Sequence, residues 1–186
     1  KEAPKCVIED NAIAVRNQAV DMLRNVYMHL YRNALDHGLE QGAVRMAQGK
    51  AAVGTIRMTA AIRADQLVLS LQDDGRGLAL SSIRKRALEN GVVGAGDVLS
   101  DQETAQLIFK PGFSTAEQVT EVSGRGVGMD AVRGFVQAAG GSIELQLQGG
   151  ASAGGYQPFA TVIRLPASLA VAPVLHLLQM PRPNAA

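Results

Sequence analysis

Two strand-like segments separated by a short connection set the strongest constraint on this fold. Residues 55–62 (TIRMTAAI) and 66–72 (QLVLSLQ) are rich in apolar side chains, and the second segment alternates apolar with polar positions. Only residues 63–65 (RAD) lie between them. Parallel strands need a crossover of a dozen or more residues, whereas a short turn joins antiparallel ones. The sequence therefore predicts an antiparallel hairpin here.

Helices and further strands flank this hairpin. A helical period predicts helices over 14–37, 81–90, 101–109 and 127–141, and strand patterns fall at 5–9, 142–148 and 160–166. The second helix has Ser81 or Ser82 as its cap and Gly91 as its stop. Because paired strands are mostly adjacent in sequence, we expect an α+β two-layer sandwich. Its sheet is mixed and largely antiparallel, with helices on one face, rather than doubly wound and parallel.

Composition and length narrow the class of protein further. A chain of 186 residues suits one domain, expected over 1–166, and the tail 167–186 is interpreted as the truncated start of a neighbouring domain. The formal net charge is +1 and only 4% of residues are aromatic, which disfavours nucleic-acid binding. The single Cys6 excludes an internal disulfide, and no apolar run reaches membrane-spanning length. We expect a cytoplasmic protein without direct membrane insertion.

The segment YMHLYRNALDHGLE, residues 27–40, gathers polar side chains on one side of a predicted helix. At about 100° per residue, six of them fall within one arc: His29, Arg32, Asn33, Asp36, His37 and Glu40. Taken alone, this arc is typical of a solvated helix surface. A metal pair of His29 and His37 is disfavoured, because they are about 12 Å apart along the helix axis. The arc needs a partner motif before it becomes a site.

Two glycine-rich motifs offer such partners. DDGRG, residues 73–77, is either a plain turn or a site where the Asp73 carboxylate accepts a hydrogen bond from a base amino group. In the second case, Gly75 and Gly77 let the backbone approach a planar ring, because they lack a Cβ atom. SGRGVG, residues 123–128, is either a flexible linker or an anion-binding loop at the start of a helix.

Neither of the two common nucleotide-binding loops is present. The third glycine of a Rossmann fingerprint would fall at Met129, and Gly49-Lys50 is followed by Ala51, where a Walker A loop needs Ser or Thr. This leaves a phosphate loop of a third kind or a flexible linker. The long irregular stretch 91–126, which contains FKPGFST, is typical of a functional lid or of a disordered segment, and a lid here would close over a nucleotide.

Four motifs together resemble one family. HLYRNALDHG, DDGRG, FKPGFST and SGRGVGMDAV occur in this order, and they closely resemble the ATP-binding kinase domain of the CheA family of chemotaxis histidine kinases. More broadly, they are similar to the ATPase superfamily of histidine kinases, DNA gyrase, Hsp90 and MutL. The resemblance covers residues 5–170, most of the chain. It implies a Bergerat-type ATP-binding fold, with ATP and Mg²⁺ as cofactors.

The resemblance also implies roles for the matching residues. Asn33 matches the asparagine that binds Mg²⁺, Asp73 matches the aspartate that reads the adenine amino group, and Arg32 and His37 match positions close to the phosphates and metal. His29 stands where the wider superfamily carries glutamate, and it would orient the nucleophile or handle its proton. The other implied nucleotide contacts are glycines and lid residues: Gly75, Gly77, Phe113, Ser114, Thr115, Gly124, Arg125, Gly126, Val127 and Gly128.

The implied activity is that of a protein histidine kinase in two-component signalling. The γ-phosphoryl group of ATP would pass to a histidine on a separate phosphotransfer domain. The resemblance also implies a dimerisation domain, a CheW-like coupling domain, a response regulator and chemoreceptors as partners, and we expect the isolated domain to be a monomer. Two alternatives are a non-catalytic nucleotide-sensing module and an ATP-hydrolysing clamp of the gyrase or Hsp90 type. The clamp predicts glutamate at position 29, where the chain has histidine.

Overall fold

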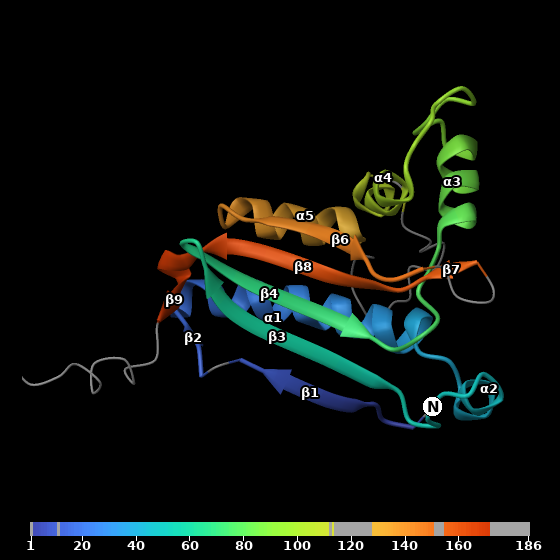
Figure 1. The fold of residues 1–186 in the computed structure, drawn as a ribbon. Helices are drawn as coiled ribbons and strands as arrows, with labels where there is room; N and C mark the ends of the chain where they lie inside the picture. The colour runs from blue at the N-terminus through green and yellow to red at the C-terminus, as the bar shows by residue number, and fades with distance from the viewer. Residues whose placement is uncertain (1, 11, 112, 114–127, 151–154, 172–186) are drawn as a thin grey trace, which may run out of the picture.

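A five-stranded sheet forms one of the two layers of the domain (Figure 1). The computed structural model describes residues 2–10, 12–111, 113, 128–150 and 155–171. The strand order is β1-β3-β4-β8-β6, with β1 pairing parallel to β3 and the other neighbours antiparallel. The strands are β1 (Lys5–Glu9), β3 (Thr55–Arg63), β4 (Gln66–Asp73), β6 (Ser142–Leu147) and β8 (Phe159–Pro166). The predicted mixed, largely antiparallel sheet is confirmed.

The predicted hairpin is the centre of this sheet. β3 and β4 pair from Ile56 opposite Asp73 to Arg63 opposite Gln66, so that only two residues form the turn. Those residues, Ala64 and Asp65, have φ values of 45° and 59°. Positive φ at both turn positions gives a twist that matches the twist of the two strands.

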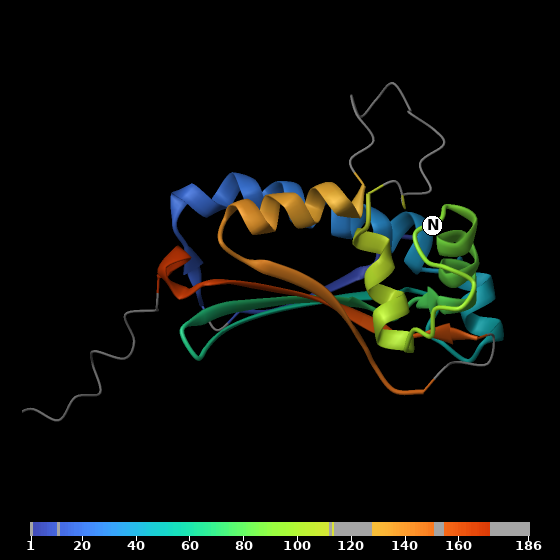
Figure 2. The ribbon, with the colours of Figure 1, turned by 90° about the horizontal axis from the view of Figure 1, so that it is seen from above.

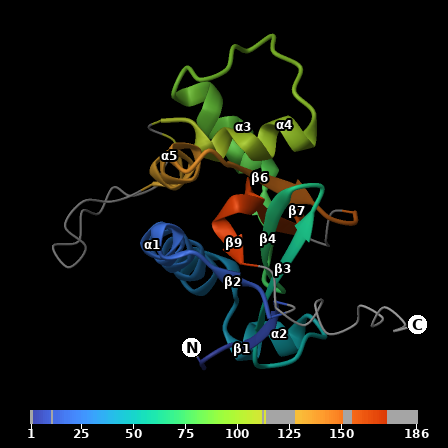
Figure 3. The same cartoon turned by 90° about the vertical axis from the view of Figure 1, so that its left-hand side faces the viewer.

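Two helices cover one face of the sheet side by side (Figures 2 and 3). They are α1 (Asn17–Asn33) and α5 (Met129–Ala138). Val26 of α1 and Val132 of α5 are fully buried, and they join the core cluster that contains Leu69 of β4. Each such side chain contributes about 1.5–3 kcal/mol of hydrophobic free energy. The expected second layer of helices on one face is therefore confirmed.

Short elements complete the fold around this sandwich. The remaining helices are α2 (Gly42–Ala47), α3 (Leu80–Glu89), α4 (Asp101–Gln106) and the turns η1 (Ala34–Gly38), η2 (Leu107–Phe109) and η4 (Ala167–Leu169). Two small strand pairs are β2 (Ala14–Val15) with β9 (Ala170–Val171), and β5 (Leu78–Ala79) with β7 (Tyr156–Gln157). Among the helices described here, none combines the length and apolar character needed to cross a membrane.

α4 covers the outer edge of the sheet. A capping box between Ser100 and Glu103 starts this helix. The side chains of Gln102 and Gln106 then hydrogen-bond to the backbone of Leu145 in β6. Side-chain amides thus occupy backbone groups that an edge strand would otherwise leave open for pairing with another chain.

Three predicted boundaries need correction. The helix predicted over 14–37 begins only at Asn17, because β2 uses Ala14 and Val15 to pair with β9, and it changes after Asn33 into the π-helical turn η1. In η1 the Leu39 N–H donates to the Ala34 carbonyl at 2.8 Å. α3 begins one residue before Ser81, and its first residue follows Ala79 without a side-chain cap.

The end of the described chain also joins the domain. Residues 167–171 form η4 and β9, and Leu169 and Ala170 lie in the main core cluster. The first part of the expected tail therefore packs with the sandwich. Residues 172–186 lie outside the described residues.

Candidate nucleotide site

Three of the sequence motifs meet at one end of the sandwich. α1 ends there at Asn33, and α5 begins there at Met129, directly after Gly128. The Asn33 side-chain nitrogen lies 3.2 Å from the Met129 sulfur, which joins the two helix ends. The residue predicted to bind Mg²⁺ thus lies beside the helix start predicted to face the phosphates.

The first glycine motif packs directly on the turn η1 that follows α1. The Arg76 N–H donates to the Gly38 carbonyl at 3.0 Å, and the Gly75 N–H donates to Asp73 Oδ1 at 2.9 Å. A Cβ atom on Gly38 would lie 2.9 Å from Asp73 Oδ1. A Cβ atom on Gly75 would lie 2.6 Å from the same oxygen and closer still to the Gly38 carbonyl oxygen. The absence of both Cβ atoms therefore brings the Asp73 carboxyl group against the end of η1.

The environment of Asp73 changes its acidity. Burial raises the pKa of the Asp73 carboxyl group, and the neighbouring carboxylates of Asp74 and Glu40 act in the same direction. The Gly75 N–H and the Lys50 ammonium group oppose this shift without cancelling it. The ionised carboxylate only accepts hydrogen bonds, whereas the protonated group also carries an O–H donor, so the protonation state of Asp73 decides how well it accepts an N–H.

His29 lies one helical turn before Asn33, on the same side of α1. Partial burial lowers the pKa of its imidazole, and the positive charge of Arg32 adds to this effect. Both causes favour the neutral ring, which can accept a proton. Arg32 and His37 are exposed, with His37 in the turn η1.

The remaining predicted contacts are placed only in part. Gly77 has a φ of 84°, a left-handed conformation that favours glycine, and its backbone lies against Gln157 and Pro158. Phe113 is buried in a second small cluster with Ala87 and Leu107, and its contact with nucleotide stays a prediction. Six predicted residues lie outside the described part of the chain: Ser114, Thr115, Gly124, Arg125, Gly126 and Val127.

A buried ionic cluster next to Asp73 was not predicted from the sequence. Glu40, expected on the polar arc of the helix, instead turns inward, because the chain leaves the helix after Gly38. Its carboxylate pairs with Arg45 at 3.1 Å and with Lys50 at 2.9 Å, and Arg45 also pairs with Asp74 at 2.9 Å. These four residues surround the turn that follows Asp73, and we call them the turn cluster.

The pattern around Arg45 explains why sequence reasoning missed the turn cluster. Arg45 is 1% exposed, whereas its apolar neighbours Val44 and Met46 in α2 are 47% and 60% exposed. This is the reverse of the usual arrangement of apolar and charged residues. The pair Gly49-Lys50 is a signal in this segment, but it resembles only part of a Walker A loop and does not by itself indicate an ionic cluster.

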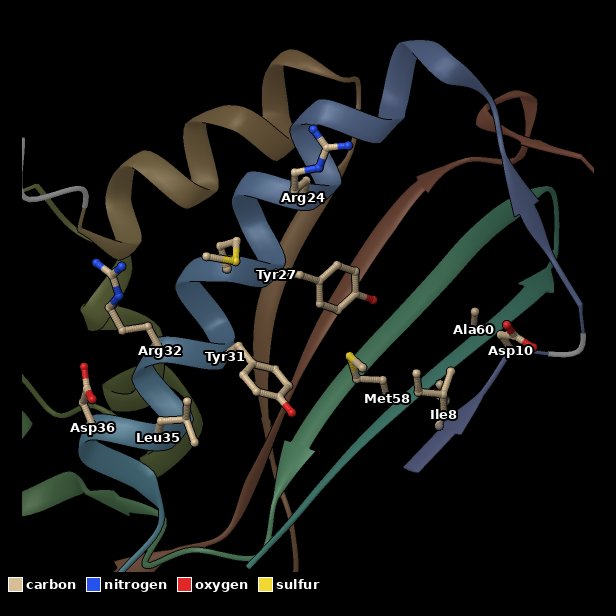
Figure 4. A pocket seen from close by; sticks show the side chains of 12 residues that line it. Ile8, Asp10, Arg24, Tyr27, Tyr31, Arg32, Leu35, Asp36, Met58 and Ala60 are labelled. Carbon is tan, nitrogen blue, oxygen red and sulfur yellow. The ribbon is translucent and has the colours of Figure 1, made fainter. Parts of the chain in front are cut away.

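An apolar cleft lies on the other flank of α1, between this helix and the strands β1 and β3 (Figure 4). It has a volume of about 650 Å³, and the side chains of Tyr27 and Tyr31 point into it from the helix toward Met58 of β3, while Leu35 also lines it. Burial raises the pKa of Tyr27 to about 12, so its phenol stays protonated. Asp73 and Asn33 do not line this cleft, whereas Arg32 does.

The fold and the converging motifs define a class of ATPase domain. A family model described as histidine kinase-, DNA gyrase B- and HSP90-like ATPase matches residues 18–168. The solved structure of a mycobacterial sensor histidine kinase, MprB, superposes with a TM-score of 0.53 at 15% identity, covering 87% of this chain and 80% of that one. This likeness supports the fold. The chain belongs to the histidine kinase-, DNA gyrase B- and HSP90-like ATPase family.

Within that family the chain is the ATP-binding domain of the CheA type. It is 40% identical over 167 residues to the chemotaxis protein CheA of Rhizobium meliloti, and 37% identical over 169 residues to that of Treponema pallidum; each match covers 90% of this chain. A gliding motility regulatory protein of Myxococcus xanthus is 39% identical over 171 residues, which is 91% of this chain. These matches take up only 21%, 20% and 21% of the relatives, so the chain spans about a fifth of their length.

Proposed function

We propose that this domain binds ATP together with Mg²⁺ and donates the γ-phosphoryl group to a histidine on a separate phosphotransfer domain. The observation that carries this proposal is the convergence of Asp73, Asn33 and the start of α5 at one end of the sandwich. A base-reading carboxylate, a metal-binding amide and an anion-binding helix start together fit a magnesium nucleotide.

The residues present suit each part of that ligand. The Asp73 carboxylate would accept a hydrogen bond from the adenine amino group, and the close packing of Gly75 on Gly38 holds that carboxylate in place. The Asn33 side-chain oxygen would contribute to Mg²⁺, whose charge offsets that of the phosphates. The N–H groups at the start of α5, beginning after Gly128, would face phosphate oxygens.

His29 stands where an ATP-hydrolysing clamp is expected to carry glutamate, which favours phosphoryl transfer over hydrolysis. A neutral imidazole accepts a proton or orients a nucleophile, and the lowered pKa of His29 keeps the ring neutral near pH 7. The catalytic contribution of this chain then consists of positioning the reactants and stabilising their charge, as in other phosphoryl transfers.

The acceptor and the signalling partners belong to the proposal as well. The relatives are about five times longer than their matching part, so they contain further segments beyond this one. We infer a histidine phosphotransfer domain as acceptor, with dimerisation and CheW-like coupling domains, a response regulator and chemoreceptors as partners, in the cytoplasm. The isolated domain is proposed to be a monomer.

The test combines nucleotide binding with transfer. Purified protein is titrated with ATP in the presence of Mg²⁺, and [γ-³²P]ATP is then supplied together with a purified CheA-type phosphotransfer domain. The expected result is label on the acceptor, lost when the acceptor histidine is replaced, with little inorganic phosphate released when no acceptor is present. Binding without transfer would establish a nucleotide-sensing module, and rapid release of phosphate without acceptor would establish an ATP-hydrolysing clamp.

A further inference from the structure

The Lys50 ammonium group makes three hydrogen bonds around the turn after Asp73. It donates to Glu40 Oε1 at 2.9 Å, to the Gly75 carbonyl at 2.8 Å and to the Asp74 carbonyl at 3.2 Å. An ammonium group has three N–H donors, so each of them is used. The Lys50 side chain is 32% exposed, whereas the Glu40 carboxylate that orients it is 5% exposed.

Arg45 also contacts the turn after Asp73, through Asp74. Its guanidinium group donates to the Asp74 carbonyl at 3.2 Å and pairs with the Asp74 carboxylate at 2.9 Å, while its Nε donates to the Ala51 carbonyl at 2.8 Å. The Asp74 carboxylate also accepts from the Thr55 N–H at 2.9 Å. Both carbonyl groups that follow Asp73 are therefore fixed by buried or half-buried cations.

These contacts reach Asp73 through a single residue, Gly75. Lys50 fixes the carbonyl of Gly75, and the N–H of the same residue donates to Asp73 Oδ1. A rotation of the Gly75 backbone would move this N–H away from the carboxylate. Lys50 has no hydrogen bond to Asp73 among its three, so it acts on this carboxylate through the turn and through its charge, which opposes the rise in the Asp73 pKa.

We propose that Lys50 is a positioning residue for recognition of the base, oriented by Glu40 and assisted by Arg45. This inference rests on the proposed function and deepens it, because it names the residues that keep Asp73 aligned for the exocyclic amino group of adenine. A nucleotide without that amino group has no hydrogen bond with Asp73, so the orientation of Asp73 does not affect its binding affinity. Lys50 therefore contributes to the preference for adenine, and it does not contribute to binding of the magnesium triphosphate.

The experiment compares two ligands that differ in one group. Binding of ATP and of purine riboside triphosphate, which lacks the 6-amino group, is measured with Mg²⁺ for the unmodified chain and for Lys50→Met. Methionine keeps the apolar length of lysine and removes its three donors. We expect ATP to bind about tenfold more weakly to Lys50→Met, and purine riboside triphosphate to change by less than about twofold.

Arg63→Met is the matched control. It removes the same unit of positive charge at the far end of the β3–β4 hairpin, away from α2 and the turn cluster (Figure 1). Both ligands should bind to this variant as they do to the unmodified chain. A general loss of positive charge would instead weaken both ligands in both variants.

A double-mutant cycle with Asp73→Asn provides the second readout. If Lys50 acts through Asp73, the Lys50→Met substitution has little further effect on ATP affinity once Asp73 is replaced. Equal weakening of both ligands by Lys50→Met, or additive effects in the cycle, would overturn the proposal. Should Lys50→Met fail to fold, Lys50→Arg retains the charge and allows the same comparison, with a smaller loss of discrimination expected. Absence of ATP binding in the unmodified chain would instead refute the proposed function.

Discussion

Replacing Gly75 by alanine tests whether the close packing of the DDGRG turn on η1 builds the site. The added Cβ atom would lie 2.6 Å from Asp73 Oδ1 and closer still to the Gly38 carbonyl oxygen, whereas ordinary contact begins at 3.4 Å. The Gly38 carbonyl cannot rotate away cheaply, because it accepts the Arg76 N–H at 3.0 Å. One of the two backbone segments must therefore shift.

The size of the effect follows from this geometry. Overpacking against a fixed neighbour typically costs about 1–3 kcal/mol, and we expect the upper half of that range because the nearest atoms belong to backbone. Gly75 has no left-handed φ, so the cost arises from the contact and not from backbone strain. At about 2–4 °C per kcal/mol for a domain of this size, the melting temperature should fall by about 4–12 °C. ATP affinity should also fall by about tenfold or more, since Asp73 is displaced with the turn.

Gly134→Ala is the control for this substitution. Gly134 lies inside α5, and a Cβ atom there would meet nothing within 4 Å. Alanine should raise stability by about 0.5–1 kcal/mol through its better helix propensity, with unchanged ATP affinity. Both variants are compared by urea denaturation and by calorimetric titration with ATP and Mg²⁺. A Gly75→Ala protein as stable as the unmodified chain, with the same affinity, would refute the reasoning.

The further predictions concern charge and metal. Burial alone would raise the pKa of Glu40, but the hydrogen bond with Lys50, the Glu40 backbone and the charges of Lys50 and Arg45 lower this pKa overall. The ionised Glu40 carboxylate therefore stabilises the fold above its ordinary pKa of 4.5, and this contribution is lost as pH falls through the lowered pKa. Urea denaturation measured against pH would detect this loss. The pKa of Asp73 is raised above 3.8, so ATP should bind more weakly as the pH is lowered, with a midpoint above 3.8. Asp73→Asn should weaken ATP binding by about 1–3 kcal/mol. Asn33→Ala should lower the factor by which Mg²⁺ strengthens ATP binding, as measured by titration with and without the metal.

Each of these predictions has a contrary outcome. A Glu40→Gln protein that loses stability in acid as steeply as the unmodified chain would exclude Glu40 as the source of that loss. An Asp73→Asn protein with full ATP affinity would remove the adenine assignment. Unchanged dependence on Mg²⁺ in Asn33→Ala would show that the metal binds elsewhere.

The sequence was informative where local patterns decide structure. The β3–β4 hairpin was predictable because a three-residue gap between two strand patterns permits little besides an antiparallel turn. The place of Asp73 at the end of β4 followed from the same pattern. The resemblance of the four motifs to a known family then predicted the type of fold and the nucleotide that it binds.

The sequence was uninformative where distant residues decide structure. Nothing near Ala14 and Val15 shows that they pair with β9, more than 150 residues later, so the start of α1 was misplaced. Glu40 has a polar side chain at a helical position, yet the π-helical turn directs it to Arg45 and Lys50. Such ionic clusters depend on tertiary contacts, which periodicity does not report.

The turn cluster also bears on how the site gains its affinity. Holding a carboxylate in one orientation costs conformational entropy. In a flexible site this cost arises when the ligand binds, and it weakens the affinity. Here the buried pair of Glu40 and Arg45 and the three hydrogen bonds of Lys50 order the turn during folding. A buried ion pair contributes little net stability compared with apolar packing, so its value in this fold lies in geometry. The cluster is therefore expected to matter more for the discrimination between nucleotides than for the melting temperature of the domain.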